Sequence, residues 1–138
     1  MSTFSIEIPC RPDALPDAMQ SIREFTQSER LDELCRHHVQ LIIEEMVVNV
    51  IDHGRPPDNQ HIDVVLRVEA EQLLIEIRDR GRLFDPTQAQ APDTSSDIDR
   101  RPVGGLGVYL TQMLSDEISY RREHGENTLV IRKRITRD

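Results

Sequence analysis

Residues 31–54 read LDELCRHHVQLIIEEMVVNVIDHG, and this stretch decides the fold. Its apolar residues recur every three or four positions, the period of an amphipathic α-helix, so it predicts a long helix from about Leu31 to Asp52. The apolar row consists of Leu31, Cys35, Val39, Ile42, Met46 and Val50. Gly54 is well placed to end the helix, and the Pro-Pro pair that follows keeps it from resuming. A helix with one apolar row needs another apolar surface to cover that row.

Segments that alternate apolar and polar side chains lie on both sides of this helix, as half-buried β-strands do. These segments are residues 4–8, 62–68, 73–77, 117–122 and 128–135. Short turns are expected at Glu71-Gln72 and around His124-Gly125-Glu126. Residues 12–26 have the spacing of a further helix, and residues 104–113 predict a short helix that opens with glycines.

Adjacent strands joined by short turns pair antiparallel, and the helices need one apolar sheet face to cover. The predicted fold class is therefore α+β. We expect a two-layer α/β sandwich with a mixed, mostly antiparallel sheet and helices on one face. The length of 138 residues suits a single domain over residues 1–138.

Charge and hydropathy exclude several functions. There are 17 Lys+Arg residues against 25 Asp+Glu, a formal net charge of −8. Nucleic acids and anionic membranes need a basic surface, so we expect neither as a direct partner. No apolar run approaches the roughly 18 residues of a membrane span, and the first residues do not resemble an export signal. We therefore expect a cytoplasmic protein.

Lys133 is the only lysine among the 17 basic residues. A Walker-A loop needs a lysine directly after its glycines, and a protein-kinase-like lobe needs one on an early strand. Neither position holds a lysine here. If this protein binds ATP, it does so without a Walker-A lysine and without the strand lysine of protein kinases.

Glu45 and Asn49 lie four residues apart on the long helix and therefore on one line of its surface. They border the apolar row, where their side chains point along the boundary between helix and sheet. A glutamate there can act as a general base, and an asparagine oxygen can ligate Mg²⁺. The pair can equally be the polar rim of an ordinary helix, and the residues alone leave both interpretations open.

Asp79 continues the inward alternation of Leu73, Ile75 and Ile77. A buried carboxylate is costly without hydrogen-bond donors, which a ligand could supply. The alternative is that the strand ends one residue earlier and Asp79 begins a turn.

The run Gly104-Gly105-Leu106-Gly107 stands where a long polar loop, from about Asp85 to Val103, meets a predicted helix. Glycines allow backbone N–H groups to approach a phosphate, and a helix N-terminus favours an anion. The glycines could also form a simple hinge. The polar loop before them could close over a ligand.

Glu45–Asn49, Asp79-Arg80-Gly81, Phe84-Asp85-Pro86 and the glycine run follow one another in a single order. That order resembles the N, G1 and G2 boxes of the GHKL, or Bergerat, ATP-binding fold of gyrase-type ATPases, sensor histidine kinases and heat-shock chaperones. It is most similar to the small bacterial branch of anti-sigma factor serine/threonine kinases.

The resemblance implies a role for each motif residue. Glu45 would be the general base, Asn49 would hold Mg²⁺ at the ATP phosphates, and Asp79 would accept a hydrogen bond from the adenine amino group. Gly81 would allow close approach, and residues at about 87–103 would form an ATP lid. Further nucleotide contacts are implied for Gly104, Gly105, Leu106, Gly107 and Thr128.

The resemblance also implies a function. The protein would bind Mg-ATP, sequester an RNA-polymerase sigma factor and phosphorylate a serine on an anti-anti-sigma antagonist of the STAS type, as a homodimer. Two alternatives are a nucleotide-gated anti-sigma binding module without kinase activity and an ATPase that drives a conformational change.

Overall fold

Five strands form one sheet in the computed structural model, which describes residues 1–54, 60–88 and 105–138. The strands are β1 (Ser2–Pro9), β2 (His61–Glu69), β3 (Gln72–Asp79), β4 (Glu117–Glu123) and β5 (Glu126–Arg134), in the spatial order β1-β2-β3-β5-β4. Each neighbouring pair is antiparallel. The predicted α+β class is therefore confirmed, and the sheet of the described residues contains no parallel pair.

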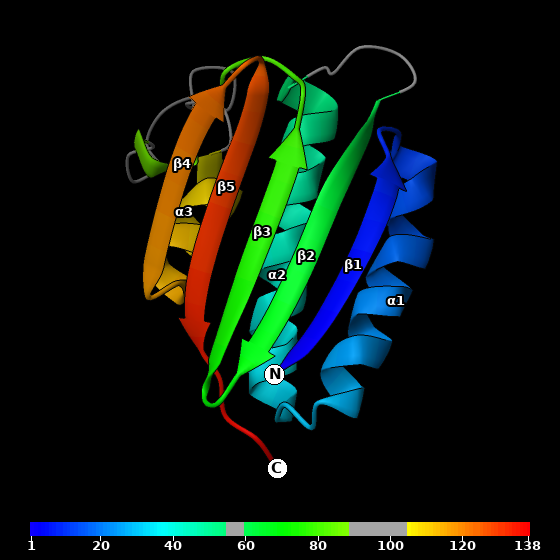
Figure 1. Ribbon diagram of the computed structural model, residues 1–138, viewed down its shortest axis with the longest axis vertical. Helices are drawn as coiled ribbons and strands as arrows, with labels where there is room; N and C mark the ends of the chain where they lie inside the picture. The colour runs from blue at the N-terminus through cyan, green and yellow to red at the C-terminus, as the bar shows by residue number, and fades with distance from the viewer. Residues whose placement is uncertain (55–59, 89–104) are drawn as a thin grey trace.

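Three helices lie on one face of this sheet (Figure 1). They are α1 (Leu15–Ser28), α2 (Glu33–Asn49) and α3 (Gly105–Leu114), and a 3₁₀ turn over Pro12–Ala14 precedes α1. The long predicted helix is α2, which begins two residues later than expected because Asp32 is its N-cap. Asp32 Oδ1 accepts a 2.8 Å hydrogen bond from the Cys35 amide.

The C-terminal end of α2 continues as a π-helical turn over Val50–Gly54. The prediction that Gly54 ends the helix stays a prediction, because residues 55–59 lie outside the described residues. Leu31 is buried as expected, but it pairs with Arg137 in an isolated β-bridge before the helix begins.

Both predicted hairpins form. The pairing of Glu69 with Gln72 makes Ala70 and Glu71 the turn residues, so this turn lies one residue earlier than predicted. The second turn consists of His124 and Gly125, both with positive φ (53° and 77°), the conformation that two-residue hairpins favour.

The core lies between α2 and the helix-facing side of the sheet. Alternate residues of β2 and β3 are fully or almost fully buried, and they face the buried stripe of α2. The buried residues of these three elements include Ile62, Val64, Leu66, Leu73, Ile75, Ile77, Val39, Ile42 and Ile43. The core is aliphatic, so its stability depends on close packing of branched side chains.

Two side chains hold α3 against the rest of the protein. Lys133 Nζ donates a 2.8 Å hydrogen bond to the Leu114 carbonyl at the C-terminal end of α3. Gln112 Nε2 donates to the Pro86 carbonyl at 2.6 Å. The lone lysine therefore satisfies a helix C-terminus, a position at which a cation is favourable.

Replacing Ile42 by alanine tests the importance of this core. Ile42 is completely buried, so Ile42→Ala is expected to lower the free energy of unfolding by about 2–5 kcal/mol in urea denaturation. Leu34, 65% exposed on the same helix, is the matched control, and Leu34→Ala is expected to change stability by less than about 0.5 kcal/mol. Equal losses in the two variants would contradict the assigned core.

Candidate functional site

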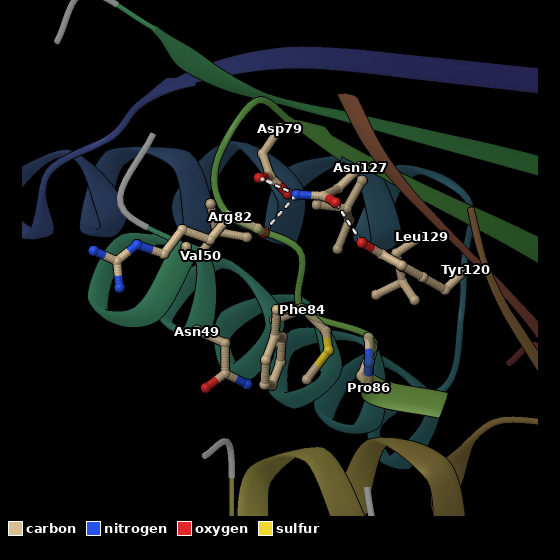
Figure 2. Close-up of a pocket in the computed structure, with 12 residues that line it drawn as sticks. Asn49, Val50, Asp79, Arg82, Phe84, Pro86, Tyr120, Asn127 and Leu129 are labelled. Carbon is tan, nitrogen blue, oxygen red and sulfur yellow. Dashed lines mark hydrogen bonds between the residues drawn. The ribbon is translucent and has the colours of Figure 1, made fainter. Parts of the chain in front are cut away.

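A small cavity opens between the C-terminal half of α2, the chain that follows β3, and the strands β4 and β5 (Figure 2). Its lining residues are Met46, Asn49, Val50, Gly54, Ile77, Asp79, Arg82, Phe84, Pro86, Tyr120, Asn127 and Leu129. The C-terminal ends of α2 and β3, which contribute to it, lie at the end of the sheet away from both chain termini (Figure 1). Most of its lining residues are apolar; the polar ones are Asn49, Asp79, Arg82, Tyr120 and Asn127.

Asp79 is one of the polar groups in the wall. β3 extends through Asp79, so the inward alternation continues and the side chain is only 8% exposed. Its Oδ1 accepts hydrogen bonds from the Gly81 amide (2.8 Å) and from Asn127 Nδ2 (3.0 Å). No residue that the structure describes donates to Oδ2, so one oxygen of a buried carboxylate remains available as an acceptor.

Gly81 brings the chain after β3 against the end of α2. A Cβ atom at Gly81 would lie 2.5 Å from the Gly54 carbonyl oxygen and 3.0 Å from Asp79 Oδ1. The next amide, of Arg82, donates to the same Gly54 oxygen at 2.6 Å. In this structure the close approach that Gly81 permits is therefore to the backbone of Gly54 and to the Asp79 carboxylate.

Asn49 is the polar group contributed by α2. The side chain is only 7% exposed, and its Nδ2 is buried without a hydrogen-bond partner among the described residues. A buried amide of this kind costs free energy unless another group satisfies it. Because Asn49 lines the cavity, the group that satisfies it can come from a ligand.

Glu45 lies one helical turn before Asn49 and does not line the cavity. Burial, and then the charge of Glu44, raise the pKa of the Glu45 carboxyl above its ordinary value. The carboxylate packs against α3, where a Cβ atom at Gly107 would lie 2.1 Å from Glu45 Oε2. Only glycine leaves room for Glu45 in this position.

The structure does not bring all the predicted residues into the cavity. Leu106 is exposed on α3, and Gly105 begins that helix. Gly104 and residues 89–103 of the expected lid lie outside the described residues; residues 86–88 form a 3₁₀ turn.

Thr128 was predicted to lie near adenine, but it does not line the cavity. It pairs across the sheet with Arg78, whereas Asn127 pairs with Asp79. Because successive side chains of a strand point to opposite faces, Asn127 enters the cavity and Thr128 faces away from the helices. The sequence contained a signal for this: Asn127 stands two residues before Leu129 and four before Ile131, so the strand period places all three on the inner face of the sheet.

The arrangement defines the class of protein. A sheet covered on one face by helices, with a cavity whose wall offers an unused carboxylate oxygen and an unpaired amide, is consistent with the GHKL ATP-binding fold. A family model described as the histidine kinase-like ATPase domain matches residues 8–133, and the chain belongs to that family.

Individual relatives agree with this family. The chain is 26% identical over 130 residues to the serine/threonine-protein kinase BtrW of Bordetella bronchiseptica, covering 94% of this chain and 92% of that one. It is 28% identical over 104 residues to the serine-protein kinase RsbW of Bacillus cereus, covering 72% of this chain and 64% of that protein. The predicted resemblance to this kinase branch is confirmed, and the relatives support protein serine kinase activity.

A solved structure agrees at the level of the fold. The RsbU and RsbW domains of a Mycobacterium tuberculosis protein superpose with a TM-score of 0.73 at 18% identity, covering 100% of this chain and 34% of that one. This chain therefore spans about a third of the Mycobacterium chain and under two thirds of the Bacillus kinase.

The contact between Gly107 and Glu45 predicts how a methyl group would act. In Gly107→Ala the added Cβ displaces the flexible Glu45 carboxylate toward solvent. Because burial is the main cause of the raised pKa, that pKa is expected to fall toward the ordinary glutamate value in a carbon-13 NMR titration.

Met113→Ala is the control for this titration. Met113 is 65% exposed on the same helix, so its removal should leave the Glu45 pKa unchanged. An unaltered Glu45 pKa in Gly107→Ala would show that α3 does not bury this carboxylate.

Proposed function

We propose that this protein is an ATP-dependent serine/threonine kinase and anti-sigma factor, formed by one domain over residues 1–138 with an ATP lid at about 87–103. One observation carries the proposal. An available acceptor oxygen on Asp79, a residue that is 8% exposed, and an unpaired buried amide on Asn49 line the same largely apolar cavity. Unsatisfied polar groups around an apolar wall suit a ligand with a flat base and a polar, charged tail.

The residues of the cavity fit ATP. Asp79 Oδ2 would accept the hydrogen bond of the adenine amino group, and the apolar side chains of Val50, Ile77 and Leu129 would cover the base. Removing apolar ring surface from water favours binding of the base.

The residues near the open end fit the phosphates. The carboxamide oxygen of Asn49 is a hard ligand of the type that Mg²⁺ prefers. Backbone amides of Gly105, Leu106 and Gly107 at the start of α3 would hold phosphate oxygens, since a helix N-terminus favours an anion. The same role is proposed for Gly104, which precedes them in the sequence. Bound Mg²⁺ supplies charge neutralisation at the phosphates, which is the main requirement of phosphoryl transfer.

Glu45 is the proposed general base. It would accept the proton that the substrate serine hydroxyl loses as that oxygen bonds to the transferred phosphoryl group. Partial burial strengthens its basicity by raising its pKa, which favours a kinase over a nucleotide-gated module without catalysis. Its place one turn from Asn49 puts the base beside the proposed Mg²⁺ ligand.

The partners are proposed from the relatives. As the resemblance to the anti-sigma factor kinases implies, the protein substrate would be an anti-anti-sigma antagonist of the STAS type, and the sequestered partner an RNA-polymerase sigma factor. We propose a cytoplasmic homodimer. The net charge of −8 is unfavourable for direct nucleic-acid or membrane binding. No helix in the described ranges is both long and apolar enough to cross a membrane.

Replacing Glu45 tests the kinase. Glu45→Gln is expected to lower the rate of phosphate transfer to the antagonist by about 10²–10⁴-fold, the usual contribution of a general base, while ATP binding is retained. Intact-mass spectrometry of the antagonist after incubation with Mg-ATP measures the transfer.

Glu44→Gln is the matched control, because Glu44 is the exposed neighbour on the same helix. It should reduce phosphate transfer far less than Glu45→Gln does, because the Glu44 charge is only the smaller cause of the raised Glu45 pKa. An undiminished rate in Glu45→Gln would remove Glu45 as the base, and no transfer by the wild type would favour the binding module.

Replacing Asn49 tests the Mg²⁺ ligand. Asn49→Ala is expected to weaken ATP binding by about tenfold or more in Mg²⁺ but little in EDTA, because only the metal-dependent contact is lost. Calorimetric titration under the two conditions measures both affinities. His37→Ala, an exposed change on the same helix, should match the wild type in each. Equal weakening with and without Mg²⁺ would contradict the metal role.

A further inference from the structure

Asn127 stands at the start of β5, directly across the sheet from Asp79, and is only 5% exposed. Both ends of its carboxamide are used. Nδ2 donates to Asp79 Oδ1 (3.0 Å), the Arg82 carbonyl (2.9 Å) and the Gly81 carbonyl (3.3 Å). Oδ1 accepts from Arg122 Nη1 (2.8 Å) and from the Tyr120 hydroxyl. Figure 2 shows Asp79 and Tyr120 on opposite sides of this amide.

The neighbours of Asn127 determine which way its amide points. A guanidinium carries donors only, so the atom that faces Arg122 must be the amide oxygen. The nitrogen then has to face Asp79 and the backbone carbonyls after β3. Arg122 Nη1 also donates to the Gly81 carbonyl at 2.8 Å, which ties it to the same segment.

The fixed amide in turn orients the Asp79 carboxylate. Oδ1 accepts from two donors, the Asn127 amide and the Gly81 backbone amide. With Oδ1 held in this way, the carboxylate cannot rotate without losing hydrogen bonds in a buried site. Oδ2 is left as an acceptor that has no donor among the described residues.

We propose that Asn127 is a positioning residue for base selection: it holds the Asp79 carboxylate so that Oδ2 faces the base as an acceptor, and the cavity then selects a purine with an amino donor at position 6, adenine, over one with a carbonyl oxygen there, guanine. The inference rests on the proposed function, that the cavity binds a nucleotide. It adds a residue that the sequence motifs did not mark.

The selectivity has a simple physical cause. The 6-amino group of adenine would complete the hydrogen bonding of Oδ2, whereas the 6-carbonyl oxygen of guanine in the same place would oppose one acceptor to another. Sites that are built to bond a particular polar group reject an analogue without it by large factors, because buried groups remain unpaired. Without Asn127, the carboxylate loses one of the two hydrogen bonds that hold Oδ1 and can rotate, so the selection weakens.

The test compares ATP and GTP binding to the full chain by calorimetry in Mg²⁺. The wild type is expected to prefer ATP by about 100-fold or more. Asn127→Ala is expected to lower this preference by about tenfold or more, mainly through weaker ATP binding. The ratio is the decisive readout, because a merely structural role would weaken both nucleotides equally.

Ile131→Val is the matched control for lost stability. Ile131 is fully buried on the same face of β5, outside the cavity lining, so the variant should keep the wild-type ratio. Arg122→Met provides a second variant should Asn127→Ala not fold. Arg122 is exposed and does not line the cavity, yet its loss frees the Asn127 amide, so the ratio should fall by about threefold.

The outcomes separate this inference from the proposed function. If the wild type binds ATP selectively, and Arg122→Met and any folded Asn127→Ala keep the same ATP-to-GTP ratio, the role of Asn127 is overturned. The proposed function is then unaffected. A wild type that binds neither nucleotide overturns the proposed function and this inference with it.

Discussion

The buried carboxylate of Asp79 is the constraint on which the site depends. An isolated carboxylate in an apolar wall is costly, so the surrounding chain has to supply donors. Gly81 supplies one from the backbone and Asn127 supplies another from the neighbouring strand. These contacts draw the end of β3, the segment after it and β5 together at one end of the sheet, where the cavity opens.

Two glycines make the close packing around this carboxylate possible. Gly81 allows the segment after β3 to touch the Gly54 carbonyl at the end of α2, and Gly107 allows α3 to lie on the Glu45 carboxylate. In both cases the limiting contact is within the protein. Motif glycines of this kind serve the folded chain itself, in addition to any part in binding phosphates.

Periodicity predicted the elements because it is a local signal. The alternation of Leu73, Ile75 and Ile77 identified β3 and correctly placed Asp79 on the inner face, and helical spacing identified α2. Boundaries were less accurate. Because Asp32 is its N-cap, α2 begins two residues later than predicted. The register of β2 with β3 places their turn at Ala70 and Glu71, one residue earlier than predicted. A cap and a register depend on contacts that spacing does not describe.

The sequence by itself determined the fold class, the order of the elements, the family and the inward position of Asp79, because each follows from local periodicity or from motif order. Only the tertiary structure decided that Asn127 and not Thr128 reaches Asp79, that Asn49 keeps an unpaired amide, and that Gly107 lies on Glu45. The physical reason is that these facts join segments far apart in the chain. They exist only once strand register and helix packing have brought those segments together.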